Sequence, residues 1–211
     1  MNKFEEALHE IQSRVDFSGV AMVVDGNGDA STASFGYANR AEKSENNLGT
    51  RFGIASGCKL FTAIAICQLV EEGKLNFNTR LKDCLDIEFL SFSEEITIHH
   101  LLTHTSGVPD YFDEDVMDDF EELWITRPMY HIKSPKDFLP MFQDEQMKFT
   151  PGESFHYNNA GYILLGLIVE QASKMEFTQY VQEHIFKKAG MMDSGYFSFD
   201  ALPSNTALGY I

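Results

Sequence analysis

The sequence has few cysteines and few cations. Its three cysteines, Cys58, Cys67 and Cys84, form neither an even set nor a C-x-x-C pair, which excludes a disulfide framework. Lys and Arg number 16 against 32 Asp and Glu, so the formal net charge is -16. A field of that sign repels phosphate backbones and anionic membrane surfaces. We therefore expect a reduced, cytoplasmic protein that has no nucleic-acid partner.

Long apolar runs and several enzyme signatures are also missing. The N-terminal stretch MNKFEEALHEIQ lacks the apolar core and cleavage site of a secretory signal, and no stretch is long and apolar enough to span a bilayer. G-x-S-x-G, H-E-x-x-H and phosphate-cradling loops do not occur. These absences exclude α/β-hydrolases, zincins and P-loop enzymes, and we expect no membrane span.

The first 40 residues predict a helix and a β-hairpin. Hydrophobic residues make up 44% of the 211 residues, with 18 Phe and 8 Tyr, which is enough for a substantial core. Phe4, Leu8 and Ile11 share one face of an amphipathic N-terminal helix. The runs 19–24 and 31–37 then favour β-strands on either side of a glycine-containing turn at 25–29.

The remainder of the chain predicts helices. The expected helical segments are 60–70, which ends before Gly73, and 98–102, 134–143, 161–173 and 176–189. We expect no strand after Gly190. This order predicts an α+β fold in which a helical lobe packs on an antiparallel sheet that is incomplete in this chain. We expect one domain over 1–211, with the helix and hairpin in 1–40 and a helical region in 41–211.

A serine and a lysine stand one turn apart at the start of the first apolar helix. Ser56 and Lys59 have the spacing that places their side chains on the same face. A serine hydroxyl is a poor nucleophile unless a base takes its proton, and a lysine can do so if its pKa is lowered. Backbone amides at a helix start can also hold an oxyanion. Taken alone, however, the pair is also what a helix-capping serine and a surface lysine would look like.

A second polar motif precedes the later apolar helix. Tyr157 and Asn159 follow a turn at Thr150–Gly152. Tyr157 can relay a proton, and Asn159 can contact Lys59 or a substrate amide. The same Tyr-x-Asn spacing occurs at 37–39, where a plain turn is the better interpretation.

Three sequence blocks together resemble the β-lactamase-related serine hydrolases. They are FGIASGCKLFTA at 52–63, IHHLLTHTSG at 98–107 and PGESFHYNNAGY at 151–162. Their order and separation are similar to the branch that contains class C β-lactamases, D-alanyl-D-alanine peptidases and related esterases. The resemblance extends from about Phe17 to Tyr210, and the first block carries the S-x-x-K motif of such enzymes.

This resemblance implies a β-lactamase/transpeptidase-like fold and an acyl-enzyme mechanism. It implies Ser56 as the acylated nucleophile, Lys59 as its proton acceptor and Tyr157 as general acid or base. Asn159 would contact the substrate or Lys59. The implied substrate is a small molecule or peptide with an amide or ester bond, and neither a metal nor an organic cofactor is expected.

The sequence departs from the family in one respect. The third motif, Lys or His followed by Thr or Ser and Gly on a strand, is missing, because His104–Gly107 has similar letters but lies in a scaffold loop. Members of the family continue past the region of Tyr210 into further strands, so we expect a truncated or clipped form. An open sheet edge predicts self-association or a complementing chain. A non-catalytic penicillin-binding-like sensor and an inert associating fragment therefore stay open as alternatives.

Histidines offer weaker signals. His100 and His104 have a spacing that a metal site could use, but no third ligand is near in the sequence, so a hydrogen-bonding pair at a helix end is favoured. His156 is expected to point into solvent or toward Glu153.

Overall fold

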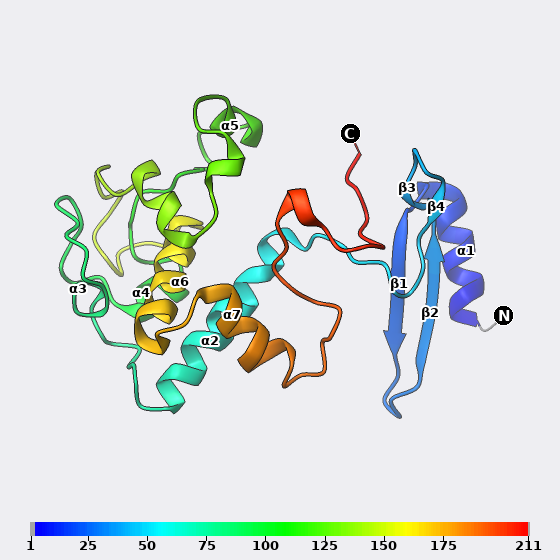
Figure 1. Ribbon diagram of the computed structural model, residues 1–211, viewed down its shortest axis with the longest axis horizontal. Helices are drawn as coiled ribbons and strands as arrows, with labels where there is room; N and C mark the ends of the chain where they lie inside the picture. Colours follow the sequence, from blue (N-terminus) through cyan, green and yellow to red (C-terminus); the bar gives the residue numbers. More distant parts are fainter. Residues whose placement is uncertain (1–2, 211) are drawn as a thin grey trace. The chain divides into compact units, whose positions relative to one another are not determined.

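The computed structural model describes residues 3–210, and the chain divides into two compact units (Figure 1). One unit combines the chain up to Ala55 with the segment from Met192 onward. The other unit is formed by Ser56–Met191. The four predicted site residues all lie in the second unit.

The first unit contains the predicted helix and hairpin. Helix α1 is Lys3–Val15, and strands β1, Gly19–Val24, and β2, Ala30–Phe35, pair antiparallel with Gly19 opposite Phe35. The Asp25 carboxylate closes the turn between them by accepting hydrogen bonds from the backbone N–H groups of Asn27 and Asp29, at 2.8 and 3.0 Å. The hairpin prediction is confirmed, except that Tyr37 belongs to the next strand.

A smaller ladder and the C-terminal segment complete this unit. Strands β3, Tyr37–Asn39, and β4, Ser44–Glu45, form a second antiparallel pair. The segment from 192 to 210 contains one 3₁₀ turn, η6, Phe199–Ala201, and an isolated parallel bridge from Thr206 to Arg51. The described residues after Gly190 form no strand, as the sequence predicted.

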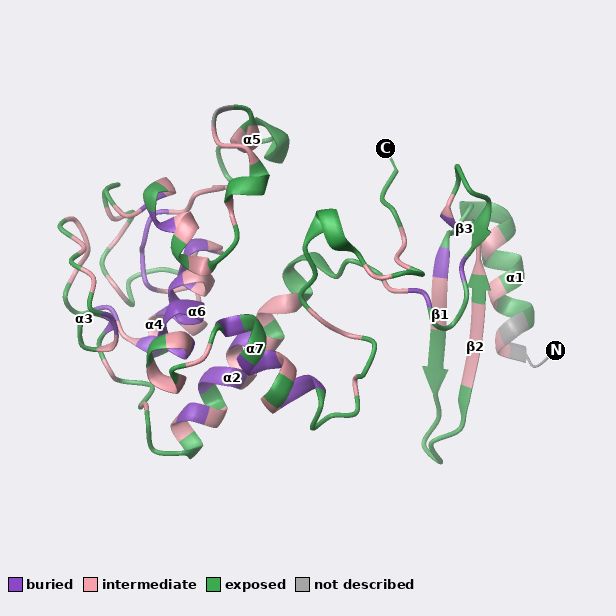
Figure 2. Ribbon diagram, viewed as in Figure 1, coloured by how far each residue is buried: buried purple, intermediate pink, exposed green. Residues whose placement is uncertain are grey.

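Two apolar helices form the core of the second unit. Helix α2, Lys59–Glu71, packs against helix α6, Ala160–Ser173, and Figure 2 shows buried residues along both. Ile66, Leu69 and Leu165 belong to this core and are fully buried. Gly73 ends α2 with a φ of +70°, as a residue just past a helix C-terminus commonly does. The two predicted apolar helices are confirmed.

Short helical segments surround this core. They are η1 (Ala55–Cys58), α3 (Leu81–Cys84), α4 (Ile98–Leu102), η2 (Phe120–Glu122), α5 (Leu123–Thr126), η3 (Met129–His131), η4 (Pro135–Met141), α7 (Phe177–Val181) and the π-helical η5 (Gln182–Phe186). The predicted helix at 134–143 is 3₁₀ rather than α. Pro140 lies inside it and has no N–H for an α-helical bond. The predicted helix at 176–189 changes from α to π at Gln182.

The predicted α+β class is confirmed in this partial form. Residues 3–210 contain helices together with two small antiparallel sheets. None of the described helices has both the length and the apolarity required to cross a membrane.

Candidate active site

Ser56 lies in a strained turn directly before α2. The preceding residue, Ala55, has a φ of +43°, in the left-handed region that residues with a Cβ rarely adopt. The 3₁₀ turn η1 then leads into α2, whose first residue is Lys59. Ser56 is exposed, and it stands at the positive end of the helix dipole. This position suits a hydroxyl that must meet a substrate and develop negative charge.

Two proton-carrying groups contact the Ser56 hydroxyl. The Lys59 Nζ lies 3.2 Å from the Ser56 Oγ, and the Tyr157 hydroxyl donates to the same oxygen at 2.8 Å. Tyr157 is 101 residues away in sequence, so only the fold brings it here. The Lys59 Nζ also lies 4.9 Å from the centre of the Tyr157 ring, within range of a cation–π interaction. The Ser56 hydroxyl is therefore in hydrogen-bond contact with both an amine and a phenol.

Asn159 contacts the Lys59 ammonium on another side. Its Oδ1 accepts a hydrogen bond from the Lys59 Nζ at 2.9 Å. The ring of Tyr162 approaches the same nitrogen, with its centre 5.7 Å away. Lys59 is therefore held by Ser56, Asn159 and two aromatic rings. An ammonium with three donors can satisfy the serine and the asparagine while keeping one N–H for another acceptor.

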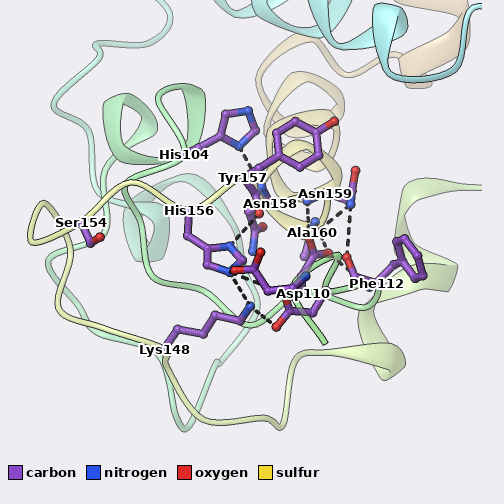
Figure 3. A network of polar contacts seen from close by, with 12 residues as sticks. His104, Asp110, Phe112, Lys148, Ser154, His156, Tyr157, Asn158, Asn159 and Ala160 are labelled. Carbon is purple, nitrogen blue, oxygen red and sulfur yellow. Dashed lines mark hydrogen bonds and ion pairs between the residues drawn. The ribbon is translucent and has the colours of Figure 1, made fainter. Parts of the chain in front are cut away.

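His104 supports the loop that carries Tyr157. Its Nδ1 accepts from the Asn158 backbone N–H at 3.1 Å, and its carbonyl accepts from the His156 N–H at 2.9 Å. The residues before and after Tyr157 are thus both bound to His104, whose ring lies 4.7 Å from the Tyr157 ring (Figure 3). Burial, together with the charge of Lys59, lowers the pKa of His104. A neutral imidazole is the form whose Nδ1 can accept a hydrogen bond.

The loop after α4 supports the same segment through its backbone. Gly107 has a φ of +72°, and a Cβ at this position would lie 2.1 Å from the Phe149 carbonyl oxygen. The Asn158 side chain is buried, donates to the Val108 carbonyl at 2.8 Å and accepts from the Gly161 N–H at 2.6 Å. Only a glycine allows the two loops to approach so closely. This geometry fits a scaffold role for His104–Gly107.

His100, His104 and His156, which the sequence singled out, make ordinary hydrogen bonds or ion pairs. The His100 Nδ1 accepts from the Thr97 N–H at the start of α4, while His104 binds Asn158. The expectation for His156 is wrong, because this side chain is half-buried and its Nε2 pairs with Asp115 at 2.9 Å instead of facing Glu153. The acidic segment 113–115 folds back over it, which local alternation cannot predict.

Asp113, Asp115 and His156 place three potential ligand atoms within 4.8 Å of one another. The Lys148 ammonium, however, already pairs with Asp113. It also contacts the His156 Nε2 at 3.1 Å (Figure 3). A cation would have to displace this ammonium. The cluster is therefore best described as an ion-pair network.

The four predicted residues, Ser56, Lys59, Tyr157 and Asn159, come together in one site, and their roles stay predictions. The lookalike at 37–39 forms β3, and its Asn39 Oδ1 accepts from the Glu42 N–H at 3.1 Å, so it is a local turn contact. Two residues of the site region were missed. His104 was interpreted only as a helix-end residue, and Asp110, which contacts Asn159, begins an acidic run that suggested a solvated loop.

Comparisons with known proteins agree on one family. A profile of the family described as Beta-lactamase matches residues 4–210. Penicillin-binding protein 4* of Bacillus subtilis (strain 168) is 33% identical over 201 residues, which cover 92% of this chain and 42% of that protein.

Two solved structures are similar over nearly the whole chain. The penicillin-binding protein from Bacillus halodurans superposes with a TM-score of 0.91 at 61% identity, over 97% of this chain and 61% of that one. An octameric penicillin-binding protein homologue from Pyrococcus abyssi superposes with a TM-score of 0.78 at 30% identity, over 99% and 47%. The chain thus spans less than two thirds of each of these relatives.

Proposed function

The chain belongs to the β-lactamase family, and from this membership and the site geometry we propose that it is a serine hydrolase that forms an acyl-enzyme at Ser56. The family resemblance and the partial β-lactamase-like fold expected from the sequence are confirmed. The observation that carries the proposal is the contact of one exposed hydroxyl with both an ammonium and a phenol, at 3.2 and 2.8 Å.

In the acylation step, the Ser56 Oγ attacks the carbonyl carbon of an amide or ester. Its proton passes to the Lys59 nitrogen, which must be a free amine at this step, and the Tyr157 hydroxyl donates a proton to the departing nitrogen or oxygen. Tyr157 recovers a proton from Lys59, so the net transfer is from serine to leaving group. The bond from the carbonyl carbon to the leaving group breaks as the ester to Ser56 forms.

Deacylation runs through the same groups in reverse. Tyr157 keeps the proton that it recovered, so a water molecule gives its proton to the Lys59 amine as it attacks the ester carbon. The Ser56 Oγ then leaves and recovers a proton from the same pair. Asn159 keeps the Lys59 amine in reach of the Ser56 Oγ in both half-reactions, since its Oδ1 contacts that nitrogen.

The oxyanion is expected to be poorly held in this chain. The backbone N–H of Ser56, at the start of the α2 dipole, is one candidate donor. The motif that supplies a second donor in the family is absent from the 211 residues. Loss of one such donor costs about a hundred- to thousandfold in rate, so we expect slow turnover by this chain.

The proposed substrates are small molecules or peptides with an amide or ester carbonyl. β-Lactams, D-amino-acid peptides and simple esters all present such a carbonyl, and the site contacts described here do not discriminate among them. The net charge of -16 argues against polyanionic partners. Self-association through the open edge of β1 is part of the proposal, and the octameric relative offers a precedent.

One alternative is supported by a specific observation. These 211 residues taken alone lack the third motif, and in that form we expect acylation by a β-lactam to be retained more readily than turnover. Stoichiometric labelling without steady-state hydrolysis would identify the sensor function.

The test is steady-state hydrolysis of a chromogenic β-lactam and of a p-nitrophenyl ester by the wild type and by Ser56→Ala. The proposal expects turnover of at least one compound, and its loss in the variant. Ser44→Ala is the matched control, because Ser44 is an exposed serine of β4 in the other unit. Turnover that persists in Ser56→Ala would reject Ser56 as the nucleophile.

A further inference from the structure

Asp110 lies half-buried next to Asn159 and takes no part in the steps above. Its Oδ2 accepts from the Asn159 backbone N–H at 2.6 Å and from the Asn159 Nδ2 at 3.2 Å. Its Oδ1 accepts from the Ala160 N–H at 3.1 Å and from the Phe112 N–H at 3.4 Å. All four partners are donors (Figure 3), which suits an ionised carboxylate because it can only accept.

These contacts fix the orientation of the Asn159 amide. The Nδ2 donates to Asp110 and also to the Phe112 carbonyl, 3.4 Å away, and both of these partners are acceptors. The Oδ1 is therefore directed to the opposite side, where it meets the Lys59 Nζ at 2.9 Å. A flipped amide would set its oxygen against the carboxylate and its NH₂ against the ammonium.

The surroundings of the Asp110 carboxylate strengthen its hydrogen bonds. Burial is the largest influence on Asp110 and raises its pKa, while hydrogen bonds from the backbone N–H groups of Asn159, Ala160 and Phe112 oppose that rise. Hydrogen bonds to a charged acceptor that is partly shielded from water are stronger than neutral ones. The same carboxylate binds two N–H groups at the start of the 14-residue helix α6.

We propose that Asp110 is a positioning residue for Lys59, which it controls by locking the Asn159 amide with its oxygen toward the lysine. This inference rests on the proposed function, because it assigns Lys59 a role in activating Ser56. Asp110 itself contacts neither Ser56 nor Lys59 through any hydrogen bond that the structure shows. Its influence must therefore pass through Asn159.

The first test measures the rate at which a fluorophosphonate labels Ser56. Asp110→Asn keeps the size of the side chain but replaces one acceptor by a donor that faces the Asn159 N–H groups. We expect labelling to slow about tenfold or more, because small misplacements of catalytic groups have large effects. Asp113→Asn, the control, removes a nearby carboxylate that contacts Lys148 and not Asn159, and it should label at nearly the wild-type rate.

A double-mutant cycle separates this role from a general structural one. If Asp110 acts through Asn159, Asp110→Asn should slow labelling in the wild type but cause little further loss in Asn159→Ala. If the loss of labelling rate in the double variant equals the product of the losses in the two single variants, the proposal is overturned. If Asp110→Asn unfolds the chain, the exchange Asp110→Asn with Asn159→Asp provides the test, since it restores a donor facing an acceptor. It should label faster than Asn159→Asp alone, and no gain would count against the proposal.

The NMR signal of the Asn159 side-chain amide tests the role of Asp110 without any labelling reaction. This NH₂ signal is assigned by its loss in Asn159→Ala. Its protons should exchange slowly with solvent in the 211-residue chain. In Asp110→Asn the signal should shift and its protons should exchange much faster. An unchanged signal would overturn the inference. If the wild type fails to label, the proposed function fails, and the amide signal still shows whether Asp110 orients Asn159.

Discussion

Tyr157 and Lys59 reach Ser56 from different parts of the chain, and each supplies a distinct chemical property. Lys59 places an amine next to the hydroxyl, and Tyr157 places a phenolic hydroxyl there, with its ring centre 4.9 Å from the Lys59 Nζ. A site of this kind needs both groups, because one proton must leave the serine and another must reach the leaving group.

Replacement of Tyr157 by Phe removes only the hydroxyl. The ring that contacts His104 at a tilt of 33° and lies beside Lys59 is kept, so folding should be little affected. We expect the acylation rate to fall about 10²- to 10⁴-fold, the usual contribution of a positioned acid or base. Stopped-flow labelling measures it, with Tyr37→Phe in β3 as the control for the same Tyr-x-Asn spacing. Equal rates in the two variants would show that the Tyr157 hydroxyl is not needed.

His104 makes the stability of the chain depend on pH. Its pKa is lowered from 6.5 in the folded state, so the unfolded state binds the extra proton more readily and stability rises with pH in this range. The contribution is fully present above the unfolded pKa of 6.5 and is lost as the pH falls through the lower folded pKa. His104→Asn removes this titration, keeps an acceptor for the Asn158 N–H and tolerates the φ of +57°.

The expected result is that the wild-type advantage over His104→Asn shrinks as the pH is lowered from about 7.5 to about 5, a range that brackets the histidine pKa. Urea unfolding at several pH values measures this difference. The other six histidines are present in both proteins, so their contributions to the difference cancel. An advantage that stays constant over this pH range would show that His104 does not make stability depend on pH.

Sequence spacing identified part of the site and not the rest. Ser56 and Lys59 are one helical turn apart, and Tyr157 and Asn159 adjoin an apolar helix, so local patterns indicated all four. Asp110 was missed because its partner Asn159 is 49 residues away and because it begins a run of acidic residues, most of which are exposed. Nothing in a local pattern tells one buried carboxylate from its solvated neighbours.

At the scale of elements, two loops determine where the N-terminal end of α6 lies. The segment 103–110 and the segment 148–160 bind each other through His104, Gly107 and Asn158. The sequence predicted α2, α4 and α6 because each has an apolar face or core at helical spacing. It did not predict these loop contacts, which depend on backbone groups that every residue carries.

Gly107→Ala tests the close approach of these loops. The added Cβ would lie 2.1 Å from the Phe149 carbonyl oxygen at a φ of +72°. We expect a loss of about 3 kcal/mol or more in the free energy of unfolding, from overpacking and left-handed strain together. Gly73→Ala is the matched control, because Gly73 has a φ of +70° and no atom within 4 Å of an added Cβ.

The control should cost only about 1 to 2 kcal/mol, the left-handed penalty alone. Urea unfolding of both variants measures the difference between steric contact and backbone strain. Similar losses in Gly107→Ala and Gly73→Ala would mean that the two loops are not held as closely as the structure shows.

At the scale of the whole molecule, the first unit has an open strand. β1 pairs only with β2 among the described residues, and its Met22, Val23 and Val24 are exposed. Such an edge with apolar side chains favours pairing with another chain. The sequence predicted the open edge from the absence of further strands. It could not indicate which residues of the strand would be exposed.

We therefore expect the chain to associate as its concentration rises. Sedimentation velocity at about 0.15 M salt, where the charge of -16 is screened beyond about 8 Å, should show a rising mean mass. Val23→Lys should reduce association, because a lysine on an edge strand opposes pairing. Val15→Lys, which changes an exposed valine of α1 in the same unit, should associate like the wild type. A wild type that stays monomeric throughout would contradict this expectation.

Whether Ser56 is a working nucleophile can be read from the intact mass of the chain after incubation with a fluorophosphonate and with a fluorescent β-lactam. We expect one added group per chain, located on Ser56 by peptide mapping and absent from Ser56→Ala. No adduct from either probe, or an equal adduct on Ser56→Ala, would contradict this expectation.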